Sequence, residues 1–118
     1  MRIEGLDHVY YWTANMDVAV AFYRDVLGLA LLRRDGDVWA EFDTGPARFA
    51  LHGREGVPAM PGGTAVFRVA DLDAARLAVT DHGVRIERTG EVEGRARFAA
   101  LRDPDGNPVQ LIEHLPAR

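Results

Sequence analysis

Only a few kinds of side chain that can do chemistry occur in this chain, and they are mainly histidines and carboxylates. The 118 residues include no cysteine, no serine and no lysine, so all 14 basic residues are arginines. Thiolate nucleophiles, zinc-thiolate centres, serine-histidine-aspartate catalysis and lysine Schiff-base chemistry are therefore excluded. Acid-base or metal chemistry has to come from the histidines, the carboxylates and a few hydroxyl groups.

Three of the candidates follow one another at alternate positions in the stretch HVYYW, residues 8–12. In a β-strand alternate side chains share a face, so we expect His8, Tyr10 and Trp12 to point the same way. There His8 could be a general base, or it could only exchange hydrogen bonds with a ligand. Tyr10 and Trp12 could stack on a flat ligand or pack as ordinary core, and their place beside His8 favours a ligand pocket.

The stretch DPDGNPVQLIEH, residues 103–114, joins an acidic turn to an alternating strand. Asp-Pro-Asp-Gly is typical of a hydrogen-bonded turn, so we interpret its carboxylates as structural and not as a catalytic pair. In the strand that follows, residues two apart share a face. Gln110 and His114 are therefore expected on one face, and Glu113 on the other.

Two segments of the chain, residues 8–27 and 64–82, follow one plan, which identifies an internal repeat. Each predicts a strand followed by a helix with apolar residues at helical spacing. Caps are expected at Asn15 and Asp71 before the helices and at Gly28 and Gly83 after them.

After each helix the apolar period changes from helical to about two, which predicts three more strands in each copy. The expected strands are 29–33, 38–43 and 47–52 in the first copy, and 84–88, 95–102 and 108–114 in the second. Each copy is then a βαβββ module within a single domain spanning 1–118. Module one covers about 5–53, the linker 54–62, and module two 63–115.

Matching the two copies places particular residues in equivalent positions. His8 matches Thr64, and Ala50 matches Gln110. By strand parity His52 shares a face with Ala50. Matching Ala40 with Ala100 would add four residues to the ligand face: Phe42, Phe98, Ala100 and Arg102.

Charge and hydropathy exclude several partners. The net charge is -4, and the arginines are interspersed with acids, which indicates a solvated surface and no nucleic-acid stripe. There is no 18-residue apolar run and no signal-peptide pattern, so we expect no membrane partner and a cytoplasmic location.

Four motifs, in this order along nearly the whole chain, carry a family resemblance: LDHV at 6–9, AVAFYRDVLGL at 19–29, VADLDAA at 69–75 and LRDPDGNPVQLIE at 101–113. With the repeat, they resemble the vicinal oxygen chelate superfamily, which includes glyoxalase I, fosfomycin-modifying enzymes, extradiol dioxygenases and bleomycin-resistance proteins. The resemblance implies an α+β fold whose two tandem βαβββ modules form a curved, cup-shaped mixed sheet with the helices outside.

The resemblance also places the metal-ligand positions of the family at His8, Ala50, Thr64 and Gln110. The family usually has His, Glu or another ligand, His, and Glu there, so only His8 fits. Alanine donates nothing, and hydroxyl and amide oxygens are weak ligands for a divalent ion. The expectation is therefore no metal cofactor. Thr64 and Gln110 would hydrogen-bond either a ligand or each other. The alternative is a divalent ion in a shifted site at His8, His52 and His114.

Two functional hypotheses follow. The first is a metal-free, bleomycin-resistance-like homodimer that sequesters an aromatic or hydrophobic small molecule. Its expected ligand-binding residues are His8, Tyr10, Trp12, His52, Thr64, Phe98 and Gln110. The second is a glyoxalase-like lyase, an isomerase or a dioxygenase, with a degenerate metal site or with His8 as the catalytic base. The sequence does not decide whether the chain is an enzyme.

Overall fold

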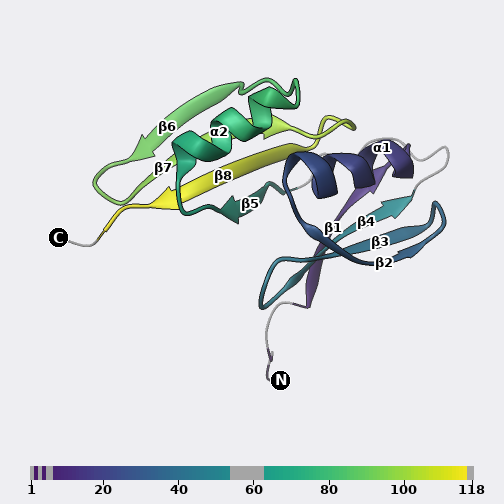
Figure 1. The fold of residues 1–118 in the computed structure, drawn as a ribbon. Helices are drawn as coiled ribbons and strands as arrows, with labels where there is room; N and C mark the ends of the chain where they lie inside the picture. The colour runs from purple at the N-terminus through teal and green to yellow at the C-terminus, as the bar shows by residue number, and fades with distance from the viewer. Residues whose placement is uncertain (1, 3, 5–6, 54–62, 117–118) are drawn as a thin grey trace. The chain divides into compact units, whose positions relative to one another are not determined.

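Two βαβββ modules make up the part of the chain that the structure describes (Figure 1). The structure is a computed structural model that describes residues 2, 4, 7–53 and 63–116. The chain divides into two compact units, Met1–Met60 and Pro61–Arg118. The predicted α+β fold with two such modules is confirmed, whereas the expected linker at 54–62 lies outside the described residues.

The first unit is a four-stranded mixed sheet with one helical segment. Its elements are β1 (His8–Thr13), α1 (Met16–Ala21), the π-helical turn η1 (Phe22–Val26), β2 (Ala30–Asp35), β3 (Trp39–Asp43) and β4 (Arg48–Gly53). The strand order is β1-β4-β3-β2. β1 runs parallel to β4, and the other pairs are antiparallel. The helix α1 packs against β3 and β4 on one face of this sheet.

The second unit repeats this plan with different side chains. Its elements are β5 (Ala65–Arg68), α2 (Leu72–Asp81), β6 (Arg88–Val92), β7 (Ala96–Arg102) and β8 (Pro108–His114), in the strand order β5-β8-β7-β6. The helix α2 packs against β7 and β8 (Figure 1). Among the described residues, no helix is long and apolar enough to cross a membrane.

Both helices begin at the predicted caps. The side chain of Asn15 accepts a hydrogen bond from the backbone N–H of Val18 at 3.2 Å, and Asp71 accepts one from Ala74 at 3.1 Å. These side chains satisfy N–H groups that lack a partner inside the helix. Each helix is followed by a glycine with positive φ, as the sequence predicted.

The core of the first unit shows that one prediction was wrong. Phe42 was expected on the ligand face, but it is fully buried on the helix face, where its ring lies 5.9 Å from Tyr23 and 6.2 Å from Phe49. The reason is the register: Glu41, and not Ala40, lies opposite Ala50 in the β3–β4 pair. The offset between the modules is therefore 59 residues in this strand and 60 in the next.

The edge strand of the second unit also differs from the prediction. The expected strand at 84–88 lies instead at Arg88–Val92. A tight turn decides this, because the backbone N–H of Arg95 bonds to the carbonyl of Val92 at 2.8 Å, and the ladder with β7 starts directly beside it. The segment Thr89-Gly90-Glu91 has little apolar alternation. The strand was therefore predicted too early in the sequence, where Val84 and Ile86 alternate with polar residues.

The acidic turn before β8 is structural, as predicted. Asp103 is buried, and its Oδ1 accepts hydrogen bonds from the backbone N–H groups of Asp105 at 3.0 Å and Asn107 at 2.8 Å. Its Oδ2 accepts another from Nδ2 of Asn107 at 2.9 Å. Gly106 completes the turn with a φ of 84°. The carboxylate of Asp103 therefore organises the backbone that leads into β8.

Candidate functional site

The face of the first sheet opposite α1 carries most of the residues that the sequence selected. His8, Tyr10 and Trp12 alternate along β1, and the parallel register places Tyr10 beside Ala50 and Trp12 beside His52. Tyr11 and Leu51, which have the opposite parity, are buried on the helix side. His8, Tyr10, Trp12 and His52 thus lie on one face.

These side chains form a contiguous cluster with a fifth ring that the sequence did not select. Trp12 lies 4.4 Å from His52 and 5.5 Å from Tyr10, measured between ring centroids. Trp39, from β3, lies 5.5 Å from His8 and 5.6 Å from His52, edge-on to both. We call this set of His8, Tyr10, Trp12, Trp39 and His52 the aromatic face. Rings at these separations and tilts attract one another.

Trp39 was missed because the third strand of the first module was matched one residue out of register. In the structure Trp39 lies opposite His52, and in the second module Phe98 lies opposite Ile112. Trp39 and Phe98 are therefore equivalent. Matching the two large aromatic residues with each other, instead of Ala40 with Ala100, would have found this residue.

Both histidines of the aromatic face are oriented through one ring nitrogen. Nδ1 of His8 lies 2.8 Å from Oδ2 of Asp7, and Nδ1 of His52 lies 2.8 Å from the carbonyl oxygen of Gly53. A carbonyl or carboxylate oxygen only accepts, so each Nδ1 carries the proton. In the neutral imidazoles Nε2 is then the acceptor, available to a ligand or to a transferable proton.

The carboxylate of Glu41, which lies on this face of the sheet, is hydrogen-bonded by a ring of the aromatic face. Nε1 of Trp39 donates to Oε1 of Glu41 at 2.9 Å, and the Glu41 side chain is only 29% exposed. Glu41 lies opposite Ala50, which is fully buried and offers no donor atom. The hydrogen bond fixes the orientation of Trp39.

On the second sheet, two of the predicted residues line one depression. Thr64 precedes β5, and Gln110 lies opposite both Val66 and Ala100 in the ladders. The depression has a volume of about 360 Å³, and Thr64 and Gln110 contribute to its wall. Within the described residues no hydrogen bond joins Thr64 to Gln110, so the expectation that they bond each other is not supported.

The remaining predicted residues of this sheet lie farther along the same face. Phe98 pairs with Ile112, and His114 lies opposite Ala96 at the exposed end of β8. Phe98 therefore shares the face of Gln110, as the alternation predicted.

Glu113 has a structural role on the helix side of the second sheet. Its Oε1 accepts a hydrogen bond from the backbone N–H of Leu72, the first residue of α2, at 2.8 Å. Nη2 of Arg97 lies 3.3 Å from the same oxygen. The carboxylates of Asp73 and Glu113 raise the pKa of Arg97 above its usual value. Glu113 thus anchors α2 to β8, on the face opposite Gln110, as predicted.

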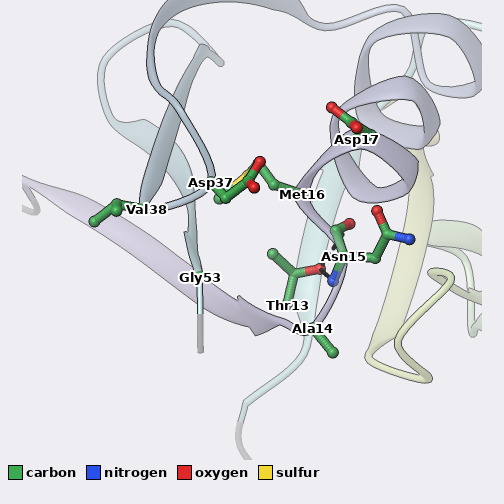
Figure 2. Close-up of a pocket in the computed structure, with 8 residues that line it drawn as sticks. All are labelled: Thr13, Ala14, Asn15, Met16, Asp17, Asp37, Val38 and Gly53. Carbon is green, nitrogen blue, oxygen red and sulfur yellow. Dashed lines mark hydrogen bonds between the residues drawn. The ribbon is translucent and has the colours of Figure 1, made fainter. Parts of the chain in front are cut away.

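A second depression, of about 580 Å³, lies where β1 leads into α1 (Figure 2). Its polar groups have partners within the protein: Oγ1 of Thr13 accepts from the N–H of Asn15 at 3.1 Å, and Arg34 donates to Asp17 at 2.7 Å and to Asp37 at 3.2 Å. None of the predicted ligand residues lines it. Its side chains serve the start of the helix.

Comparison with known proteins identifies the family. The model of the Glyoxalase/Bleomycin resistance protein/Dioxygenase superfamily matches residues 5–111. The chain belongs to this superfamily. The uncharacterized protein YaeR of Escherichia coli is 28% identical over 96% of this chain and 98% of its own length. The metallothiol transferase FosB of Staphylococcus epidermidis is 34% identical, but over only 48% of this chain and 40% of FosB.

The fold is that of solved structures in the same superfamily. The lactoylglutathione lyase of Agrobacterium tumefaciens superposes with a TM-score of 0.81 over 95% of both chains, at 21% identity. At that identity the likeness concerns the fold alone.

The residues at the metal positions that the resemblance implied do not fit a divalent ion. His8 offers an imidazole, but Ala50 offers nothing, and Thr64 and Gln110 offer neutral oxygens. Across residues 7–53 and 63–116, no group of three or more histidine, aspartate or glutamate side chains is placed to hold a metal.

The role of Glu113 can be tested directly. We expect Glu113→Gln to lower the free energy of unfolding by about 1–2 kcal/mol, because the charged acceptor for the first N–H of α2 is lost. Urea unfolding followed by circular dichroism measures this. Glu93→Gln, in the exposed turn after β6, is the control and should change stability by less than about 0.5 kcal/mol. Equal stability of the two variants would contradict the assignment.

Proposed function

We propose that this protein binds a planar aromatic small molecule on the aromatic face, without a metal ion. The observation that carries the proposal is the cluster of five rings on the sheet face opposite the helix. Tyr10 is 42% exposed within it, whereas the core rings Tyr23, Phe42 and Phe49 are at most 3% exposed. Contiguous exposed apolar surface of this kind marks interaction sites.

The polar groups around the rings would orient such a ligand. Nε2 of His8 and Nε2 of His52 are the acceptors of the two oriented imidazoles, and the Tyr10 hydroxyl can donate or accept. An apolar wall with a few fixed polar groups is the usual composition of a small-molecule site. The expected ligand is therefore flat, with one or two hydrogen-bond donors at its edge.

The absence of a metal requirement is supported by the chemistry of the donor set. Three of the four positions that the family resemblance marks for ligands carry neutral or inert side chains in this chain: Ala50, Thr64 and Gln110. A divalent ion must exchange its hydration shell for anionic or strongly donating ligands. We also propose a homodimer, which the resemblance to the superfamily implies.

Ligand binding can be followed by tryptophan emission, because both tryptophans of the chain, Trp12 and Trp39, lie on the aromatic face. We expect a planar aromatic ligand selected by thermal shift to quench this emission. Trp12→Ala should weaken its binding about tenfold, equal to about 1.4 kcal/mol, through loss of ring stacking.

Leu77→Ala is the control for this measurement, because Leu77 is a large apolar residue that is 66% exposed on α2, in the other unit of the chain. The Leu77→Ala variant should bind the aromatic ligand with the same affinity as the unchanged protein. If Trp12→Ala binds the ligand as tightly as Leu77→Ala does, Trp12 is only a packing residue.

Metal content is a separate prediction. Protein purified without chelator should contain far less than one equivalent of any divalent ion by elemental analysis, and added manganese, zinc or nickel should not raise its melting temperature. A near-stoichiometric ion that is lost in His8→Ala would overturn the metal-free proposal.

A second candidate function rests on the pairing of His8 with Asp7. A carboxylate on Nδ1 fixes the tautomer of an imidazole and leaves Nε2 as the proton acceptor, as in a general base. The corresponding activity would be proton abstraction from a carbon acid, such as the thiol adduct of a dicarbonyl compound.

For this candidate we expect His8→Gln to abolish deuterium exchange into such an adduct, and Asp7→Asn to slow it with little change in KM. Proton NMR in heavy water measures the exchange. Exchange at the wild-type rate in His8→Gln would exclude His8 as the base.

A further inference from the structure

The open face of the second sheet, opposite α2, has a different charge from the aromatic face. One row across the strands reads Val66, Gln110, Ala100 and Arg88, and the next reads Arg68, Ile112, Phe98 and Gly90. The equivalent rows of the first sheet hold Tyr10, Ala50, Glu41 and Arg33, and then Trp12, His52, Trp39 and Asp35. In these two rows the second face has no carboxylate, and Val66, Arg68 and Ile112 take the places of Tyr10, Trp12 and His52.

Arg88 lacks the carboxylates that its counterpart has. In the first sheet Arg33 lies 3.5 Å from Asp35 and 3.9 Å from Glu41. The guanidinium of Arg88 instead lies over the Phe98 ring, 5.4 Å from its centroid. No ion pair within the described residues involves Arg88, so its charge is offset only by this cation–π contact and by solvent.

A glycine fixes the ring beneath Arg88. A Cβ atom at Gly90 would lie 2.4 Å from Cζ of Phe98, so the ring lies directly across the Gly90 backbone. Only glycine leaves room for this placement, which puts the ring beside Arg88, two residues earlier on the same strand. The guanidinium therefore has a preformed platform, which lowers the entropy lost when it binds a ligand.

A second guanidinium is held near the first. Nε of Arg102 lies 2.8 Å from Oε1 of Glu87, and its Nη1 donates to the carbonyl of Gly106 at 2.8 Å. Arg88, Arg102 and Glu87 line the depression of about 360 Å³ together with Thr64 and Gln110. Two guanidinium groups and one carboxylate leave one net positive charge.

From this arrangement we propose that the depression binds the carboxylate of an organic acid, with Arg88 as its main partner. A guanidinium matches a carboxylate with two parallel N–H···O bonds. Glu87 would repel a phosphate dianion more than a monoanion, which favours a carboxylate. The exposed Val66 and the neighbouring Phe98 and Ile112 would contact the apolar body of the acid. This site does not depend on the proposed aromatic face.

Isothermal titration calorimetry with 2-naphthoate tests the proposal, with neutral 2-naphthamide and inorganic phosphate as comparison probes. We expect 2-naphthoate to bind at least tenfold more tightly than either probe. Arg88→Met, which keeps an apolar side chain over Phe98, should weaken naphthoate binding at least tenfold. Arg95→Met, in the turn at the other end of β7, removes the same charge and should leave binding unchanged.

Three results would overturn the proposal: equal affinity for the amide, tighter binding of phosphate, or unchanged affinity in Arg88→Met. Gly90→Ala supplies a second variant, since displacing the Phe98 ring should weaken naphthoate binding while Arg88 is retained. Circular dichroism melting confirms that each variant is folded.

Trp12→Ala separates this site from the aromatic face. Naphthoate binding that survives Trp12→Ala and is lost in Arg88→Met supports the carboxylate site, whether or not the aromatic face binds a ligand of its own. Binding lost in Trp12→Ala and retained in Arg88→Met refutes it and leaves only the aromatic face.

Discussion

The register in which the last strand of each module pairs with its neighbours decides which side chains are available to a ligand. β4 and β8 lie inside their sheets, each between a parallel and an antiparallel partner. A shift of one residue would exchange the two faces along the whole strand. The buried Leu51 and Leu111 prevent such a shift, because either would then leave the core. Ala50 and Gln110 are thereby held on the open faces.

Much of the fold was readable because its signals are local. The caps Asn15 and Asp71, the glycines after the helices and the acidic turn before β8 each form contacts within a few residues. The internal repeat then supplied the order of the elements. The alternation of His8, Tyr10 and Trp12 likewise placed them on one face without knowledge of any distant partner.

The errors arose where position depends on pairing between strands. β6 is set by the turn that joins it to β7, and its polar composition gave no signal of its own. The third strand of the first module is offset by one residue relative to the repeat, which sent Phe42 to the core and Trp39 to the open face. The periodicity of the sequence does not reveal a difference of one residue in the length of the β3–β4 hairpin. Such a difference nevertheless moves every side chain of the matched strand to the other face of the sheet.

The uneven distribution of the two tryptophans has a consequence for how the folding of this protein can be observed. Both lie in the unit Met1–Met60, and the unit Pro61–Arg118 has none. Emission therefore reports on the tertiary structure of one half, whereas the far-ultraviolet circular dichroism signal comes from both. If the halves unfold in one cooperative step the two signals must coincide, and any separation between them measures how far one module can lose its structure without the other.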